Sequence, residues 1–222
     1  MRTLVELIVT IIYFSTLAIL TFSIFKIPVR NSDKQIAIIG LVVGSTLYYC
    51  KDIIETPIFF LIILLVFVLS LMLLRKYPLL YSFIVASTGL ITSSLADGLA
   101  SSAAMKLQLT TIELMRNDLV HFSGIHLVVS VLFLIVAAAL VKTKTGFSFV
   151  VRRFSGRRPL NKSNFIWALV LVIGILFLQF TVKPFYDFQG IILISVFAVI
   201  VMILLIASHQ NAKVLKDRFG KE

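Results

Sequence analysis

The chain is dominated by apolar stretches, each close in length to a membrane-spanning helix, with short polar connections between them. A helix needs about 20 mostly apolar residues to cross a bilayer. Lipid offers the backbone no hydrogen-bond partners, so such segments must be helical. The expected spans are residues 4–25, 35–50, 58–74, 79–99, 119–141, 165–182 and 189–208. The sequence therefore predicts an all-α fold, a polytopic membrane helix bundle of about seven transmembrane helices.

Composition supports a membrane environment over a soluble one. Of the 222 residues, 59% are hydrophobic and 14% charged, whereas a soluble domain has about 45–50% apolar and about 25% charged residues. The first apolar run exceeds the roughly 7–15 residues of a signal-peptide core, so we expect it to remain as a span. The expected parts are a bundle over 1–208 and a short cytoplasmic tail over 209–222, in the cell membrane as a multi-pass protein.

The distribution of positive charge predicts the orientation. With the N-terminus outside, 16 of the 21 Lys and Arg residues fall in the segments 26–34, 75–78, 142–164 and 209–222, on the cytoplasmic side. Cytoplasmic loops carry an excess of these residues in membrane proteins. The split depends on counting 35–50 as a span, although that segment is short. We therefore expect the N-terminus outside and the C-terminus in the cytoplasm.

The densest positive charge lies in residues 141–162, which hold seven cations and no acid. Three phenylalanines are interleaved with them, so we expect this loop to lie on an anionic membrane surface. Docking of a regulatory partner remains an alternative, and nucleic-acid binding is not expected because no folded recognition unit surrounds the patch. The cations expected to contact lipid or a partner are Lys142, Lys144, Arg152, Arg153, Arg157, Arg158 and Lys162.

Segment 35–50 contains Gly40 and Gly44, a spacing that lets helices pack closely. We expect small-residue packing within the chain rather than a dimer interface. Cys50 is the one cysteine, so a disulfide within the chain is excluded, and we expect it to be a small apolar residue near a helix end.

Three ionisable residues near the outer ends of two spans are the candidate ligand-binding residues. Asp97 is the one acid in the Ser- and Thr-rich segment 79–99, and a count at about 1.5 Å per residue places it near the outer interface. His121 and His126 open the next span. Ionisable residues inside membranes are functional candidates. Alternatives are an interfacial or capping role or a proton path for Asp97, and a buried hydrogen bond for His126.

Aromatic residues near the expected span ends are typical of an interfacial belt; they are Tyr48, Tyr49, Tyr77, Tyr81, Trp167 and Tyr186. No metalloprotease, nucleophile-elbow or phosphate-loop motif occurs in the sequence. We therefore expect no enzyme activity, no cofactor and no metal site.

Two stretches, KYPLLYSFIVASTG at 76–89 and KTGFSFVVRRF at 144–154, belong to a layout of many spans, small outer loops and a basic inner loop before the last pair. In this layout the chain resembles the membrane sensor region of accessory-gene-regulator-type histidine kinases of Gram-positive bacteria, and related stand-alone small membrane proteins of spore-forming bacteria. The resemblance implies signal transduction without catalysis. It does not extend to a kinase module, because His209 precedes Gln210 and Asn211 and no phosphate-binding glycine loop is present.

The expected function is therefore a non-catalytic sensor or regulatory bundle that signals to a cytosolic partner. The alternative is a small-solute transporter or the substrate-binding subunit of one. The expected partners are the lipid bilayer, a cytosolic kinase or other signalling protein, and a second copy of the chain.

Overall fold

The computed structural model describes residues 2–29, 32–50 and 59–146. The spans expected at 165–182 and 189–208 and the tail at 209–222 lie outside the described residues. All regular elements in the described part are helices, as predicted. They are α1 (Arg2–Ile24), α2 (Asp33–Tyr48), α3 (Phe59–Arg75), α4 (Leu79–Lys106), α5 (Ile112–Asn117) and α6 (Leu119–Thr143).

Three of these helices, α1, α4 and α6, are long and apolar enough to cross a membrane, with 23, 28 and 25 residues. The apolar α3 is shorter at 17 residues, and α2 has 16. Each coincides with an expected segment, but α4 continues seven residues past its expected end at residue 99. The short α5 was not expected from the sequence.

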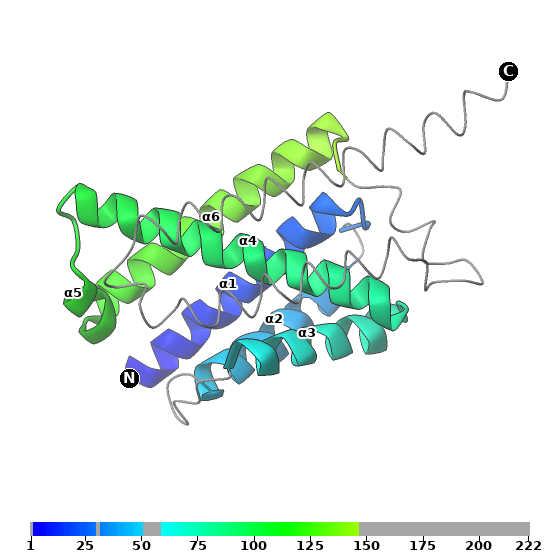
Figure 1. Ribbon diagram of the computed structural model, residues 1–222, viewed down its shortest axis with the longest axis horizontal. Coiled ribbons are helices and arrows are strands. Elements are labelled where there is room, and N and C mark those ends of the chain that lie inside the picture. The colour runs from blue at the N-terminus through cyan, green and yellow to red at the C-terminus, as the bar shows by residue number, and fades with distance from the viewer. Residues whose placement is uncertain (1, 30–31, 51–58, 147–222) are drawn as a thin grey trace, which may run out of the picture.

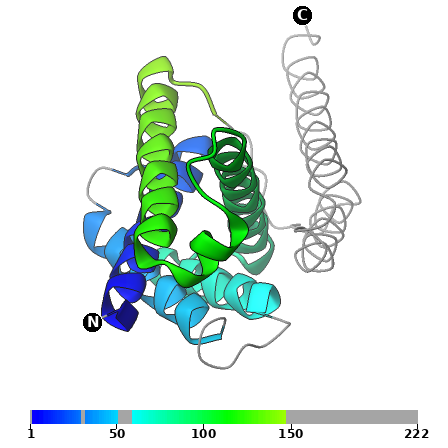
Figure 2. The ribbon, with the colours of Figure 1, turned by 90° about the vertical axis from the view of Figure 1, so that its left-hand side faces the viewer.

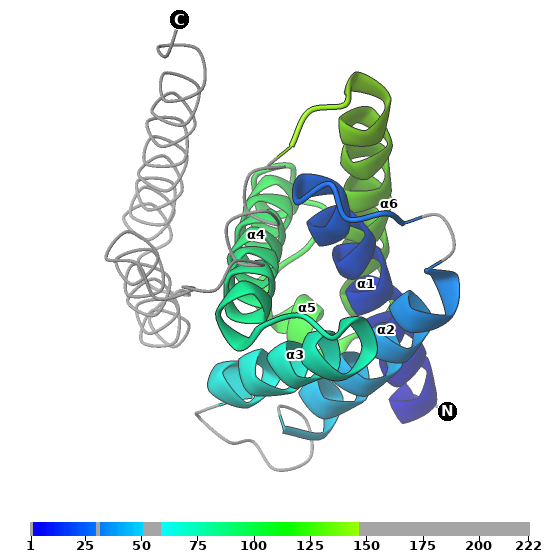
Figure 3. The same cartoon turned by 90° about the vertical axis from the view of Figure 1, so that its right-hand side faces the viewer.

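Helix α1 lies at the centre of the described bundle, packed against α2, α4 and α6, while α3 contacts α2 and α4 (Figure 3). Helix α1 runs in the opposite direction to α4 and in the same direction as α6. The N-terminal ends of α1 and α6 meet where the Arg2 Nη1 donates to the Asn117 carbonyl at 3.0 Å. Their C-terminal ends meet where Gly146 lies against the Ile24 carbonyl. The largest fully buried core side chains include Leu17, Phe22, Ile39, Ile63, Phe67, Leu71, Val85 and Val129.

Close packing between α1 and α2 depends on the two glycines of α2. A Cβ built on Gly44 would lie 2.9 Å from the Ile11 Cα and 3.1 Å from the Thr10 carbonyl oxygen. A Cβ on Gly40 would collide with the Ser15 hydroxyl. The glycine pair therefore packs inside the chain, as expected, and brings the backbones of two antiparallel helices into contact.

Three helices end at one end of the bundle, which we call the basic end, and each is followed closely by a lysine in the left-handed conformation. Lys26, Lys76 and Lys144 have φ values of 50°, 52° and 53°. A left-handed residue is a common way to end a helix, and a cation there complements the negative end of the helix dipole. The described charged residues of this end are Lys26, Lys34, Arg75, Lys76, Lys142 and Lys144, with one acid, Asp33.

The opposite end of the bundle carries three acids, Glu6, Glu113 and Asp118. It is closed by the Gln108 turn and by α5, which lies between the facing ends of α4 and α6 (Figures 1 and 2). The Thr111 hydroxyl accepts a hydrogen bond from the Leu114 amide and caps α5, and the Asp118 carboxylate caps α6 by accepting from the Val120 amide. Side-chain caps of this kind satisfy amides that a helix leaves without partners.

Candidate functional site

A hydrogen bond between two helices forms the centre of the candidate site. The phenol of Tyr13, on α1, donates to the Asp97 Oδ2, on α4, at 2.7 Å. The same phenol lies 3.4 Å from the Ser93 carbonyl, one turn earlier on α4. Tyr13 is buried, with 3% of its surface exposed. A charge-assisted bond of this length is stronger than a neutral one, so the pair holds α1 and α4 in a defined register.

The third helix reaches this pair through an imidazole. The ring of His126, on α6, contacts the Tyr13 ring edge-to-face, with centroids 5.3 Å apart. Phe133, two turns further along α6, contacts Tyr13 at 5.5 Å. We call Tyr13, Asp97 and His126 the Tyr13 cluster. Because its members come from α1, α4 and α6, a change at any one of them acts on the packing of all three helices.

Within the described residues, the recorded hydrogen bond of the His126 ring uses one of its two nitrogens. Its Nδ1 lies 3.0 Å from the Phe122 carbonyl oxygen, one turn earlier on α6. A carbonyl oxygen only accepts, so this contact places a proton on Nδ1. The neutral ring then offers its Nε2 as an acceptor, and the charged ring offers it as a donor. Phe122 also stacks on the imidazole, with centroids 4.3 Å apart, which fixes the plane of the ring.

His121 belongs to a different contact from the other two predicted residues. Its Nε2 lies 3.5 Å from the Asp118 Oδ2, three residues earlier, and both side chains are partly exposed. The structure therefore brings Asp97 and His126 together against Tyr13, and places His121 with Asp118 at the start of α6. Asp118 therefore has two contacts at the start of α6: it lies close to His121 and it caps the helix.

Asp97 lies 18 residues along α4 from Leu79, as in the sequence count, and α4 continues beyond the expected end at residue 99 to Lys106. Nine further residues at about 1.5 Å each leave Asp97 roughly 13 Å from the end of α4. Its partner Tyr13 stands at the middle of α1. A carboxylate at this depth is costly in lipid without partners, so the Tyr13 hydrogen bond has a structural reason as well as a candidate function.

The hydroxyl groups of α4 mostly bond within their own helix rather than across helices. The Thr88 hydroxyl donates to the Ile84 carbonyl and the Thr92 hydroxyl to the Thr88 carbonyl, each at 2.8 Å. Other α4 hydroxyls are buried and have no hydrogen-bond partner within the described ranges. They belong to Ser82, Ser87 and Ser102. The polar residues of α4 therefore mostly satisfy their hydrogen bonds within the helix, and three hydroxyls have no partner recorded among the described residues.

Two of the seven predicted lipid-contact residues lie within the described structure. Lys142 and Lys144 are exposed at the end of α6, beyond the apolar surface of that helix. Arg152, Arg153, Arg157, Arg158 and Lys162 lie outside the described residues. In the part of the chain that the structure covers, no three His, Cys, Asp or Glu side chains gather as metal ligands would. Cys50 is a buried free thiol after the end of α2.

Sequence reasoning missed Tyr13, the residue that joins the cluster. The signal was present: five of the six tyrosines fall near expected span ends, and Tyr13 alone lies in the middle of an apolar segment. A phenol at that depth needs a buried acceptor. Asp97 on another span was the natural acceptor to consider.

The Tyr13 cluster can bind a ligand or a proton, because it combines a carboxylate, a phenol and an imidazole beside aromatic rings. No known protein family, curated protein or solved structure matches the chain.

Proposed function

We propose that this chain is a non-catalytic, multi-pass cell-membrane protein that senses a ligand at the Tyr13 cluster and signals to a cytosolic partner, a kinase or another signalling protein. The observation that carries the proposal is the hydrogen bond from Tyr13 to Asp97 beside His126. It is a polar contact at which α1, α4 and α6 meet. Buried polar networks of this kind have few alternatives in lipid and define discrete packing arrangements.

The proposed topology has the N-terminus outside, about seven spans and the basic end in the cytoplasm. Its support is the excess of Lys and Arg at one end of the described bundle, together with the alternating directions of α1 to α4 and the shared direction of α1 and α6. The Tyr13 cluster then lies towards the outer half of the bundle. The resemblance to sensor regions of accessory-gene-regulator-type kinases of Gram-positive bacteria agrees with this topology.

The proposed signal passes along two continuous helices. α1 and α6 both contact the cluster, and both end at the basic end, where Gly146 lies against the Ile24 carbonyl. A ligand that competes for Asp97 or His126 shifts α4 relative to these helices, because it removes a contact that holds them together. The shift reaches the start of the basic segment 141–162. A ligand moves this balance only by binding one arrangement more tightly than the other.

Transport of a small solute is the second candidate, and one observation favours it. Within the described residues, no hydrogen-bond partner is recorded for the hydroxyls of Ser82, Ser87 and Ser102, which are spread along α4 on both sides of Asp97. Donors and acceptors at several depths are what a solute path through a bundle requires. The same cluster would then be a substrate site rather than a sensing site.

One experiment separates the two candidates. Cells that lack the gene are compared with cells that carry the wild type, Asp97→Asn or the control Asp33→Asn, at equal membrane levels. A sensor predicts that deletion changes a defined set of transcripts, that wild type and Asp33→Asn restore it, and that Asp97→Asn does not. Unchanged transcripts contradict the sensor. A solute whose cellular content falls on deletion and is not restored by Asp97→Asn supports transport instead.

A further inference from the structure

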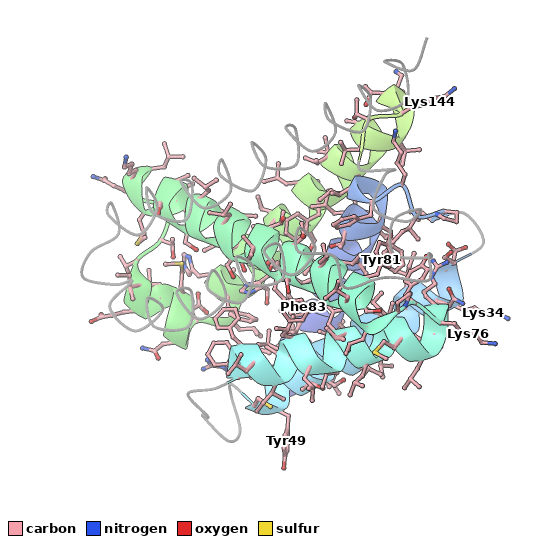
Figure 4. All side chains as sticks on the ribbon, turned by 45° about the vertical axis from the view of Figure 1, so that its right-hand side comes forward. Lys34, Tyr49, Lys76, Tyr81, Phe83 and Lys144 are labelled. Atoms are coloured by element: carbon pink, nitrogen blue, oxygen red, sulfur yellow. The ribbon has the colours of Figure 1, made fainter. Side chains whose placement is uncertain are left out.

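The ends of α2 and α3 place three cations together at the basic end of the bundle. The Gln35 side-chain amide donates to the Leu74 carbonyl at 3.2 Å, which holds the start of α2 against the end of α3. Lys34 is therefore a neighbour of Arg75 and Lys76, and Figure 4 shows Lys34 and Lys76 extending from the same end, with Lys144 further along it. We call Lys34, Arg75 and Lys76 the cation cluster.

Arg75 is held in place, and no ion pair is recorded for it among the described residues. Its guanidinium lies over the Phe22 ring, 4.9 Å from the centroid. Its Nη2 makes a long contact of 3.4 Å with the Pro28 carbonyl. Its Nε is buried and has no hydrogen-bond partner among the described residues. A guanidinium fixed in this way, with donors to spare, suits a phosphate group.

Carboxylates do not neutralise the cation cluster within the described ranges. The ion pairs recorded there, Arg2 with Glu6 and Asp118 with His121, both lie at the opposite end of the bundle. Asp33 is the one described acid near the cluster; it is exposed and occupies the first turn of α2. Three cations against one acid leave a net positive charge that attracts an anion.

Two further groups at this place can donate to an anion. Pro78 is the N-cap of α4 and provides no side-chain acceptor, so the first amides of that helix are not capped by a side chain; helix geometry gives them no partner within the helix. Burial raises the pKa of the Tyr77 phenol above 10.0, and Arg75 opposes the shift only in part. The phenol therefore stays a neutral hydrogen-bond donor.

An exposed apolar stripe on α3 leads directly to the cation cluster. Its four leucines are spaced by four residues, so they lie along one face of the helix. The last of them, Leu73, is 77% exposed and stands two residues before Arg75, and Leu79 on the other side of the cluster is 62% exposed. We call this set the α3 leucine stripe: Leu61, Leu65, Leu69 and Leu73.

We propose that the cation cluster and the α3 leucine stripe together bind one anionic phospholipid. Its phosphate lies between Lys34, Arg75 and Lys76, and an acyl chain lies along the stripe. The juxtaposition of both features favours a lipid over a free anion, which would use only the cations. It also favours a lipid over an acidic protein, which would not need an apolar stripe that runs the length of α3.

The test uses the full-length protein, purified in a neutral detergent, with lipid binding measured by native mass spectrometry. Dioleoylphosphatidylglycerol, dioleoylphosphatidylcholine and inorganic phosphate are the three probes. We expect the anionic lipid to bind at least about tenfold more tightly than the zwitterionic one, because the three cations attract its net negative charge. We expect inorganic phosphate to compete only weakly.

Two charge-matched variants separate a site from general surface charge. Lys34→Gln/Lys76→Gln removes two exposed charges from the cation cluster, and Lys26→Gln/Lys106→Gln removes two exposed charges outside it. The first variant is expected to lose about tenfold in affinity for phosphatidylglycerol and the second less than about threefold. Arg75→Lys keeps the charge, and we expect it to weaken binding because it loses the planar guanidinium.

A separate variant tests the contribution of the α3 leucine stripe. Leu65→Ala/Leu69→Ala is expected to weaken binding of both lipids, because it removes exposed apolar surface without touching the cations. Equal affinity for the two lipids would overturn the proposal, as would equal losses in the two charge-matched variants. Competition by inorganic phosphate as strong as by lipid would show an anion site without a lipid. Retention of an acidic protein in place of lipid would show a protein-docking surface.

Discussion

At the scale of single residues, Tyr13 explains why Asp97 is tolerated inside an apolar bundle. The sequence identified Asp97 and His126 as candidates from their placement, but it did not connect them, because contacts between spans depend on how the helices rotate. Tyr13 connects them by donating to the Asp97 carboxylate and by contacting the His126 ring. Two of the three residues of the Tyr13 cluster were thus candidates from the sequence, whereas Tyr13 and the separation of His121 emerged only from the packed bundle.

The first prediction concerns the hydroxyl group of Tyr13. Tyr13→Phe keeps the ring contacts but removes the donor to Asp97, and we expect it to lower the free energy of unfolding by about 1–2 kcal/mol. Thermal unfolding in detergent measures the loss. Tyr49→Phe is the control, because that side chain is 53% exposed. Equal stability of the two variants would show that the Tyr13 hydrogen bond contributes nothing.

The second prediction separates the two roles of Asp118. Asp118→Asn keeps an acceptor for the Val120 amide but loses the ion pair with His121, and we expect a cost within about 0.5 kcal/mol, since exposed pairs are weak. Asp118→Ala also loses the cap, and we expect about 1 kcal/mol. The comparison is made by thermal unfolding. A cost for the Asn variant as large as for the Ala variant would mean that the ion pair, not the cap, stabilises α6.

At the scale of helices, apolar length predicted each of the longer elements and, apart from the end of α4, their approximate limits. The limits of α1, α2, α3 and α6 lie close to the expected segments because hydrophobic runs end abruptly at charged residues. The extension of α4 beyond residue 99 was missed because "ASSAAMK" is not apolar, although its Ala and Met residues favour a helix. The short α5 was missed because its six residues carry no spanning signal.

The third prediction concerns the glycine contact between α1 and α2. Gly44→Ala places a Cβ 2.9 Å from the Ile11 Cα, so two backbones must separate, and we expect a loss of about 1–3 kcal/mol. Gly124→Ala is the matched control on α6, because a Cβ there meets nothing within 4 Å. We expect it to be neutral or to stabilise by less than about 1 kcal/mol. Similar unfolding temperatures for the two variants would contradict the close packing of α1 and α2.

At the scale of the whole molecule, the described bundle has two chemically different ends. Six of its cations and one acid lie at the basic end, where α1, α3 and α6 finish. The charge pattern of the sequence predicted this separation before any contact was considered, because alternating spans place every second loop on the same side. The number of spans beyond residue 146 remains a prediction, since the segments at 165–182 and 189–208 lie outside the described residues.

The central claim is that the basic end faces the cytoplasm and the opposite end faces outside. Asn117→Cys and Thr145→Cys, each in a Cys50→Ala background, report the two ends through exposed side chains. Intact cells are treated with a membrane-impermeant maleimide, before and after permeabilisation. The account predicts that residue 117 is labelled in intact cells and that residue 145 is labelled only after permeabilisation. Labelling of residue 145 in intact cells would contradict the orientation and, with it, the proposed path from an outer ligand to a cytosolic partner.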